Sequence, residues 1–288
     1  MINHGSNINE LKMNITSPVV TAPSNKIKIT GYGFFLLEKG KGDDEEWNYK
    51  KIFERGIGLS LAQNVFESYK DEFIEKGNGN SIIPIDDFML VIHYFCSKEG
   101  RKDGPVSLIV YLDPKDSKIN YTKLYLLSKK ITKQYKTSKK VESTMAICED
   151  SIEIPRLEHL AGVFVIDING CPFFTMVGST QEKANEKEVH ISGFISAIMT
   201  FSKEIIGKES IGGSLKEINF GSKRIYIITK NNIIFAYLVD KMEPIIRHYI
   251  YMLSDVFLHK YKEEIKKFNG NSVPFEDFRT IIGNYFKI

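Results

Sequence analysis

The spacing of apolar residues predicts two strands and a helix at the start of the first half of the chain. β-branched and aromatic residues at 27–37 and 47–53 predict the two strands. From Leu59 onward, apolar residues recur at steps of three and four, which predicts an amphipathic helix. Ser60 is the expected N-cap of this helix, and Gly77 is expected to end it.

Two further apolar runs, at 88–95 and 106–112, are separated by a polar turn. They predict a long antiparallel hairpin. A three- and four-residue spacing then predicts a helix at 120–135. The first half therefore has the order strand, strand, helix, strand, strand, helix, which leaves it one strand shorter than the second half.

An echo in the sequence leaves a second interpretation of the run at 88–95 open. Residues 77–88 resemble residues 269–278, and both segments follow an amphipathic helix. If the echo is a true internal repeat, residues 88–95 form a helix. The favoured interpretation treats both segments as helix ends followed by a Pro–Asp/Glu start, because the run at 88–95 has no polar face that a helix could present to water.

The second half shows the strongest local signals. An Asn169-Gly170 turn between apolar runs at 161–167 and 172–177 predicts a β-hairpin. A helix is expected next, at 190–206. The remaining expected elements are strands at 215–220, 223–229 and 233–239, a helix capped by Asp240 with Pro244 in its first turn, and a short helix at 275–286.

These elements predict an α/β (α+β) fold with two domains, whose mostly antiparallel sheets carry helices on their faces. The domains are expected at 26–135 and 158–288. Residues 136–157 have little periodicity and are interpreted as a linker, which could hold a short strand at 145–148. Residues 1–25 contain many Asn, Ser and Pro residues and are interpreted as a flexible tail.

Composition and charge exclude several classes of protein. A formal net charge of +3 over 288 residues is too small to indicate a nucleic-acid-binding protein. The odd number and wide spacing of Cys96, Cys148 and Cys171 do not form a disulfide framework, which favours a reducing compartment. No apolar stretch approaches the ~18–20 residues of a membrane span. We therefore expect a cytoplasmic protein with at most peripheral membrane contact.

No motif for catalysis, metal binding or cofactor binding stands out. Gly40-Lys41-Gly42 follows a strand, but the acidic run after it would repel a phosphate group. His93 and Cys96 are a close pair of metal-ligand types, but their spacing on a strand places the side chains on opposite faces. There is no GxSxG nucleophile motif. We expect no catalytic residue, no metal site and no cofactor, and hence no enzyme.

The order of elements in the second half resembles that of the longin domain, a profilin-like α/β/α module. The longin opening hairpin is matched by AGVFVIDINGCPFFTM, its first helix by HISGFISAIMTFSKEI, and its three-stranded meander by LKEINFGSKRIYIITKNNIIFAYLVD. Residues 27–135 are similar to the first longin domain of the tandem-longin proteins that activate Rab-type GTPases. The resemblance implies two profilin-like α/β/α domains.

The same resemblance implies an adaptor or assembly subunit of vesicle trafficking. Its partners would be a small GTPase, a second longin or roadblock-type protein, or both, in a homodimer or a heterodimer. Any guanine nucleotide exchange would come from deforming the GTPase and not from catalytic residues of this chain. The alternative is a sensory module that holds a small molecule against its sheet, as related profilin-like folds do.

Candidate partner-binding residues lie on three of the expected helices. Leu61 widens the apolar face of the first helix, and Met199 and Ile206 widen that of the helix at 190–206; they mark either an interface or burial against the other domain. Lys129 and Lys133 belong to a basic helix that could meet anionic lipid or an acidic protein, or form a solvated face. The stripe expected to face the sheet in the helix at 190–206 comprises Ile191, Phe194, Ile195, Ile198, Phe201 and Ile205.

Overall fold

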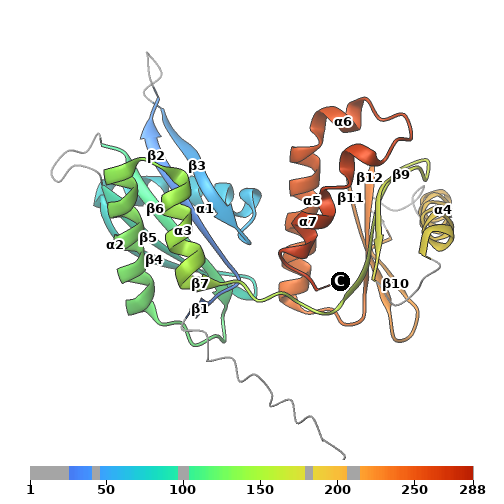
Figure 1. Cartoon of the computed structure of the whole chain (residues 1–288), viewed down its shortest axis with the longest axis horizontal. Coiled ribbons are helices and arrows are strands. Elements are labelled where there is room, and N and C mark those ends of the chain that lie inside the picture. Colours follow the sequence, from blue (N-terminus) through green and yellow to red (C-terminus); the bar gives the residue numbers. More distant parts are fainter. Residues whose placement is uncertain (1–25, 41–45, 97–103, 179–183, 206–214, 288) are drawn as a thin grey trace, which may run out of the picture.

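The computed structural model describes residues 26–40, 46–96, 104–178, 184–205 and 215–287 (Figure 1). Two sheets, each of five antiparallel strands, dominate these residues. Helices cover both faces of each sheet, because each face carries a separate cluster of buried apolar side chains. The predicted α+β fold class with mostly antiparallel sheets is confirmed.

The first domain contains one of these sheets. Its elements are β1 (Ile27–Lys28), β2 (Gly31–Lys39), β3 (Trp47–Arg55), α1 (Leu59–Lys76), β4 (Asn78–Ile85), β5 (Phe88–Cys96), β6 (Val106–Pro114), α2 (Tyr121–Ser138), α3 (Val141–Ser151) and β7 (Ile152–Glu153). The strand order is β3-β2-β6-β5-β4, and β1 pairs separately with β7. Helix α1 packs on one face of the sheet, while α2 and α3 pack on the other.

The second domain contains the other sheet. Its elements are β8 (Leu160–Asp167), β9 (Pro172–Val177), α4 (Ala184–Ile205), β10 (Glu217–Asn219), β11 (Arg224–Lys230), β12 (Ile233–Val239), α5 (Pro244–Lys260), α6 (Lys262–Lys266), the 3₁₀ helix η1 (Val273–Phe275) and α7 (Phe278–Gly283). The strand order is β10-β11-β12-β8-β9. Helix α4 packs on one face, while α5 and α7 pack on the other.

The two five-stranded sheets have the same topology. When the strands of each sheet are numbered along the chain, both sheets have the order 2-1-5-4-3, and a long helix connects the second strand to the third. That helix is α1 in the first domain and α4 in the second. The helix after the fifth strand is α2 in the first domain and α5 in the second. Each element of one domain can therefore be compared with an equivalent in the other.

Strand β4 was absent from the sequence prediction, which placed only a helix end between Gly77 and Phe88. Here β4 pairs with β5 along its whole length, so residues 88–95 form a strand as favoured and not the alternative helix. Strand β4 is at the sheet edge, where only Ile83 is fully buried and Pro84 is tolerated because one side of the strand needs no partner. The echoed segment at 269–278 forms a turn and η1 instead, so the echo is not a structural repeat.

The segment expected to be a linker holds a helix. Helix α3 occupies Val141–Ser151, and so the short strand considered at 145–148 is wrong. Thr144 and Cys148 are buried on this helix, and Cys148 belongs to the same apolar cluster as residues of the sheet and of α2. A weakly amphipathic segment is helical here because the tertiary contact stabilises it.

Both predicted helix caps are wrong. Gly58 precedes α1, and the Ser60 hydroxyl, inside the helix, donates to Asp255 Oδ2 at 3.2 Å. Glu243 precedes α5, while Asp240 lies 3.5 Å from Lys223 Nζ in an ion pair. In each case a polar side chain near the helix start bonds to a more distant residue, which the local sequence does not reveal.

The two domains meet where the first sheet presents backbone groups near the ends of β2 and β3. The Thr30 carbonyl accepts a hydrogen bond of 2.8 Å from the Tyr249 hydroxyl. The Gly56 carbonyl accepts one of 2.8 Å from His248 Nε2, which must carry a proton because a carbonyl only accepts. The Gly56 N–H donates to the Tyr285 hydroxyl at 3.2 Å. Side chains of the second domain therefore satisfy buried backbone groups of the first.

Glycine is required at this junction because two backbone segments touch. A Cβ on Gly31 would lie 2.5 Å from the Gly56 carbonyl carbon, and a Cβ on Gly56 would lie 2.4 Å from the Thr30 oxygen. Gly56 also has a φ of +80°, which favours glycine. No side-chain rotation relieves either contact, since both partners are backbone atoms.

We predict that Gly56→Ala lowers the free energy of unfolding by more than about 3 kcal/mol, because the backbones must separate and the left-handed conformation adds about 1 kcal/mol. Gly221→Ala is the matched control, since Gly221 has a φ of +77° and no atom within 4 Å of an added Cβ. It should lose only about 1 kcal/mol. Urea unfolding followed by circular dichroism measures both, and equal losses would contradict the close backbone contact.

A buried polar cluster ties α2 to the first sheet. The Ser128 hydroxyl donates to the Leu124 carbonyl at 2.9 Å, and it lies 2.7 Å from His93 Nδ1 and 2.9 Å from the Tyr111 hydroxyl. With its one proton given to Leu124, Ser128 accepts from both His93 and Tyr111. Burial lowers the pKa of His93 from 6.5 to about 4, so His93 is neutral in the folded protein at neutral pH.

This cluster predicts a loss of stability on acidification. The folded-state pKa of His93 lies below its unfolded value, so the unfolded chain binds the proton first, and stability falls as the pH drops from about 6.5 toward 4. Replacing His93 with Gln should make the decline between pH 7.5 and pH 5 shallower, as measured by urea unfolding across about this range. An equally steep decline in the variant would contradict a contribution from the buried His93.

Candidate interaction surface

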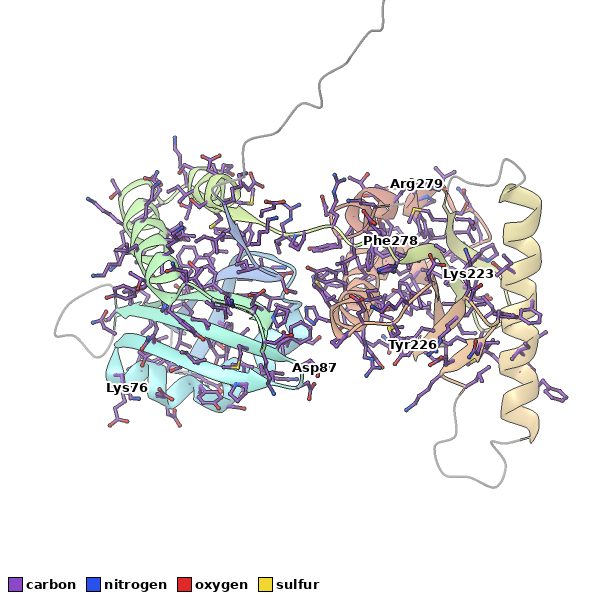
Figure 2. All side chains as sticks on the ribbon, turned by 90° about the horizontal axis from the view of Figure 1, so that it is seen from below. Lys76, Asp87, Lys223, Tyr226, Phe278 and Arg279 are labelled. Carbon is purple, nitrogen blue, oxygen red and sulfur yellow. The ribbon has the colours of Figure 1, made fainter. Side chains whose placement is uncertain are left out.

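Helix α4 presents an apolar face to solvent. Phe194 and Phe201 are seven residues apart, on the same side of the helix, and are 43% and 63% exposed. Phe220, which is 51% exposed, joins them from the turn after β10, with its ring centroid 6.2 Å from that of Phe194. We call these three side chains the α4 aromatic patch. Helix α4, which carries two of them, lies at the end of the molecule away from the first domain (Figures 1 and 2).

The opposite side of α4 packs on the sheet through two small serines and through the larger Ile195 and Met199. Ser192 and Ile195 are buried, as are Ser196 and Met199. The Ser196 hydroxyl donates to the Ile168 carbonyl at 3.3 Å, which requires a close approach of the helix to the hairpin turn. The expected stripe is therefore rotated: Phe194 and Phe201 face outward instead of toward the sheet.

Helix α1 is the equivalent of α4 in the first domain. Its outward positions are polar and exposed, whereas those of α4 carry two phenylalanines. Both helices cover the same face of the same kind of sheet, so the architecture does not require an outward aromatic pair. The exposed outward positions of α1 are Gln63, Asn64, Glu67, Ser68 and Asp71.

The five residues predicted to bind a partner do not gather on one surface. Met199 is 3% exposed and belongs to the core beneath α4, so its side chain is not on a free surface. The sequence places Met199 at the margin of the apolar face of the helix. In the structure the helix is rotated, so that Met199 points toward the sheet. Ile206 lies outside the described residues.

Leu61 lines a cleft of about 600 Å³ between the two domains. Leu61 is partly buried there, and its role in binding a partner stays a prediction. The His248 ring lies 5.3 Å from that of Phe88 in the same cleft, and burial lowers the His248 pKa. Figure 2 places Asp87 on the side of the first domain that faces the second. The other residues around the cleft are Ile85, Asp86, Pro244, Arg247 and Tyr251.

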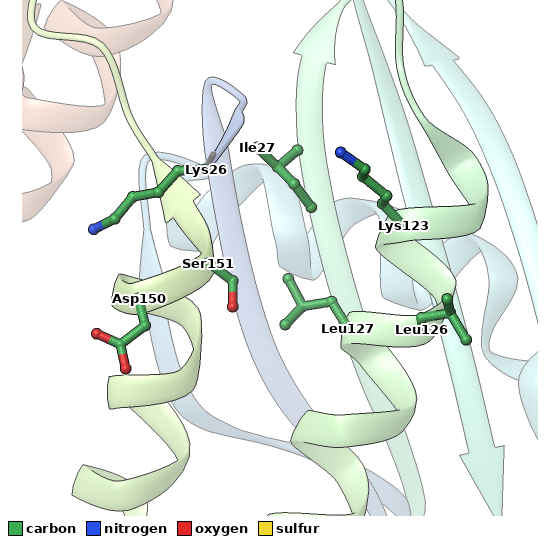
Figure 3. Close-up of a pocket in the computed structure, with 7 residues that line it drawn as sticks. All are labelled: Lys26, Ile27, Lys123, Leu126, Leu127, Asp150 and Ser151. Carbon is green, nitrogen blue, oxygen red and sulfur yellow. The ribbon is translucent and has the colours of Figure 1, made fainter. Parts of the chain in front are cut away.

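Lys129 and Lys133 lie on the outward face of α2 and line a hollow of about 760 Å³ at the start of β4 and the end of β5. A different groove, of about 690 Å³, separates α2 from α3 (Figure 3). Its side chains have mixed character: α2 contributes Lys123, Leu126 and Leu127, and α3 contributes Asp150 and Ser151. The basic residues predicted to bind therefore line the first hollow and not the second.

The described residues offer little for catalysis. They contain no group of three or more His, Cys, Asp or Glu side chains that could hold a metal ion. Among them, no disulfide joins the three cysteines, and burial raises the pKa of Cys148 to about 12, which disfavours the reactive thiolate. No helix in the described part of the chain is long and apolar enough to cross a membrane.

No protein-family model matches the chain, and no curated protein matches it. Among solved structures, it is similar to a Roadblock/LC7 domain from Streptomyces avermitilis, with 12% sequence identity over 37% of this chain and 88% of that domain. The TM-score is 0.31, and at this value the similarity carries no argument about function.

The location of the α4 aromatic patch predicts that it contributes little to folding. Replacing Phe194 and Phe201 with Ser should lower the free energy of unfolding by less than about 2 kcal/mol, because 43% of Phe194 and 63% of Phe201 are exposed. Met199→Ala should cost about 2–5 kcal/mol, since it leaves a cavity in the core. Urea unfolding measures both, and a large loss for the double variant would show that the two phenylalanines belong to the core.

Proposed function

We propose that this chain is a non-enzymatic adaptor subunit that binds another protein through the α4 aromatic patch. The observation that carries the proposal is the contrast between equivalent helices: α1 is polar on its outward face, whereas α4 exposes Phe194 and Phe201. The fold needs no outward aromatic residues there, so their exposure is explained by a surface that a partner covers.

The chemistry of the patch suits a protein partner. Aromatic side chains bury large areas with few rotatable bonds, and they are enriched among the residues that dominate binding energy. The patch combines a helix face with a residue of the neighbouring turn, so it offers a shallow surface and not a ligand-sized cavity. Lys223 and Arg224 follow Phe220 closely in the sequence and form ion pairs with Asp240 and Glu217.

For the identity of the partner, we propose a second longin or roadblock-type subunit, in a homodimer or a heterodimer. An apolar helix face fits a similar helix of another α/β domain. A small GTPase is the second partner we propose, engaged by the assembled pair, with nucleotide exchange by deformation of the GTPase during vesicle trafficking in the cytoplasm. The resemblance in the sequence supports this finer part, and the exposed patch supports the coarser one.

The test uses the full chain with Phe194 and Phe201 both replaced by Ser. Sedimentation velocity of the chain alone measures self-association, and mixtures with longin, roadblock and small GTPase proteins of the same host measure heterotypic binding and nucleotide release. We expect at least about tenfold weaker association for the double variant, the effect of losing aromatic anchors from an interface.

The matched control replaces Leu126 and Val273 with Ser, because these are exposed apolar residues on other elements. This control should bind as the unmodified chain does. If the unmodified chain stays monomeric and binds none of the candidates, or if both double variants lose binding equally, the proposal is wrong.

A further inference from the structure

The hollow beside α2 has the features of a small-ligand site. Its wall is one face of α2, since Tyr125, Lys129, Thr132, Lys133, Lys136 and Thr137 recur at steps of three, four and one along the helix. The opposite side is formed by Asn78 and Gly79 at the start of β4 and by Phe95 and Cys96 at the end of β5. The volume of about 760 Å³ is enough for a phosphorylated sugar or an inositol headgroup.

The charge of the hollow has one sign. Lys129, Lys133 and Lys136 line it, and no carboxylate is among its lining residues. Within the described residues, none of the three ammonium groups forms an ion pair. A concave surface lined by uncompensated charge of one sign concentrates ions of the opposite sign.

Two of these lysines are already oriented by neighbouring groups. Lys129 Nζ lies 4.7 Å from the centre of the Tyr125 ring, and Lys136 Nζ donates to the Cys96 carbonyl at 3.1 Å. Neither contact neutralises the positive charge. Less side-chain entropy is lost when a ligand binds to lysines that are partly ordered beforehand.

Thr132 gives an independent indication of a ligand. It is 5% exposed, it lines the hollow, and its buried hydroxyl has no hydrogen-bond partner within the described part of the chain. Thr137, on the same helix, donates to the carbonyl four residues earlier, at 3.0 Å, as helical threonines commonly do. An unpaired buried hydroxyl is costly, so its persistence beside three lysines points to a group that pairs with it.

We infer that this hollow binds a phosphorylated small ligand, with a phosphomonoester between the lysine ammonium groups and the Thr132 hydroxyl. Phosphate oxygens accept several charge-assisted hydrogen bonds at once, which a single carboxylate does less well. A merely solvated basic face accounts for exposed lysines such as Lys130, but it does not account for a buried hydroxyl without a partner. This inference does not rest on the α4 aromatic patch, which lies on the other domain.

The experiment is isothermal titration of the full chain with inorganic phosphate and with inositol 1,4,5-trisphosphate. The variant Lys129→Gln with Lys133→Gln should bind the trisphosphate at least about tenfold more weakly, because charge-assisted hydrogen bonds are lost. Thr132→Val should weaken binding about threefold or more while leaving the urea unfolding midpoint the same or higher, since the hydroxyl has no partner in the free protein.

Two matched variants separate this site from other effects. Lys130→Gln removes one positive charge from the same helix outside the hollow, and it should bind normally. The chain with Phe194 and Phe201 replaced by Ser should also keep full affinity for the trisphosphate, whatever its effect on protein partners. Failure of one proposal is thus distinguishable from failure of the other.

Vesicles distinguish a lipid headgroup from a soluble source. Binding to phosphatidylcholine vesicles that contain phosphatidylinositol 4,5-bisphosphate, with competition by the trisphosphate, assigns the site to a headgroup. Binding of the trisphosphate without vesicle binding assigns it to a free ligand. The inference is overturned if neither phosphorylated probe binds, if a polyglutamate peptide binds in their place, or if phosphatidylserine vesicles bind equally well and Thr132→Val has no effect.

Discussion

The carbonyl groups of Thr30 and Gly56 lie in a buried position where the first sheet offers them no strand to pair with. Tyr249 and His248, both on α5, donate to them, and the Tyr285 hydroxyl accepts from the Gly56 N–H. An unpaired buried backbone group costs about 1–3 kcal/mol, so three such pairings are a strong constraint on how the domains meet. The close contact of Gly31 with Gly56 brings these groups together.

This junction decides which helices remain available. Helix α5 covers one face of the second sheet and also meets the first domain, so its surface is used within the chain. Helix α4 covers the other face of that sheet and is left at the far end of the molecule. The aromatic patch on α4 and the basic hollow beside α2 therefore lie on different domains. Two ligands of different chemistry could be bound at once without competing for the same surface.

The two surfaces differ in physical character as well as in place. The α4 aromatic patch is shallow and apolar, which suits a large partner that displaces water over a wide area. The hollow beside α2 is concave and basic, with one buried hydroxyl, which suits a compact anion. An adaptor that combines protein binding with recognition of a phosphorylated group could assemble its partners where that group is present.

The sequence by itself determined the α+β fold class, the hairpins and the order of elements in the second half, because local spacing and turn residues such as Asn169-Gly170 act over a few positions. The sequence also identified Lys129 and Lys133 as candidate binding residues. Only the tertiary structure decided that β4 is an edge strand, that α3 is a helix and that Ser60 pairs with Asp255. Contacts between residues far apart in the sequence stabilise these three features. The rotation of α4, which buries Met199 and exposes Phe194, likewise depends on how closely small residues let the helix approach its sheet.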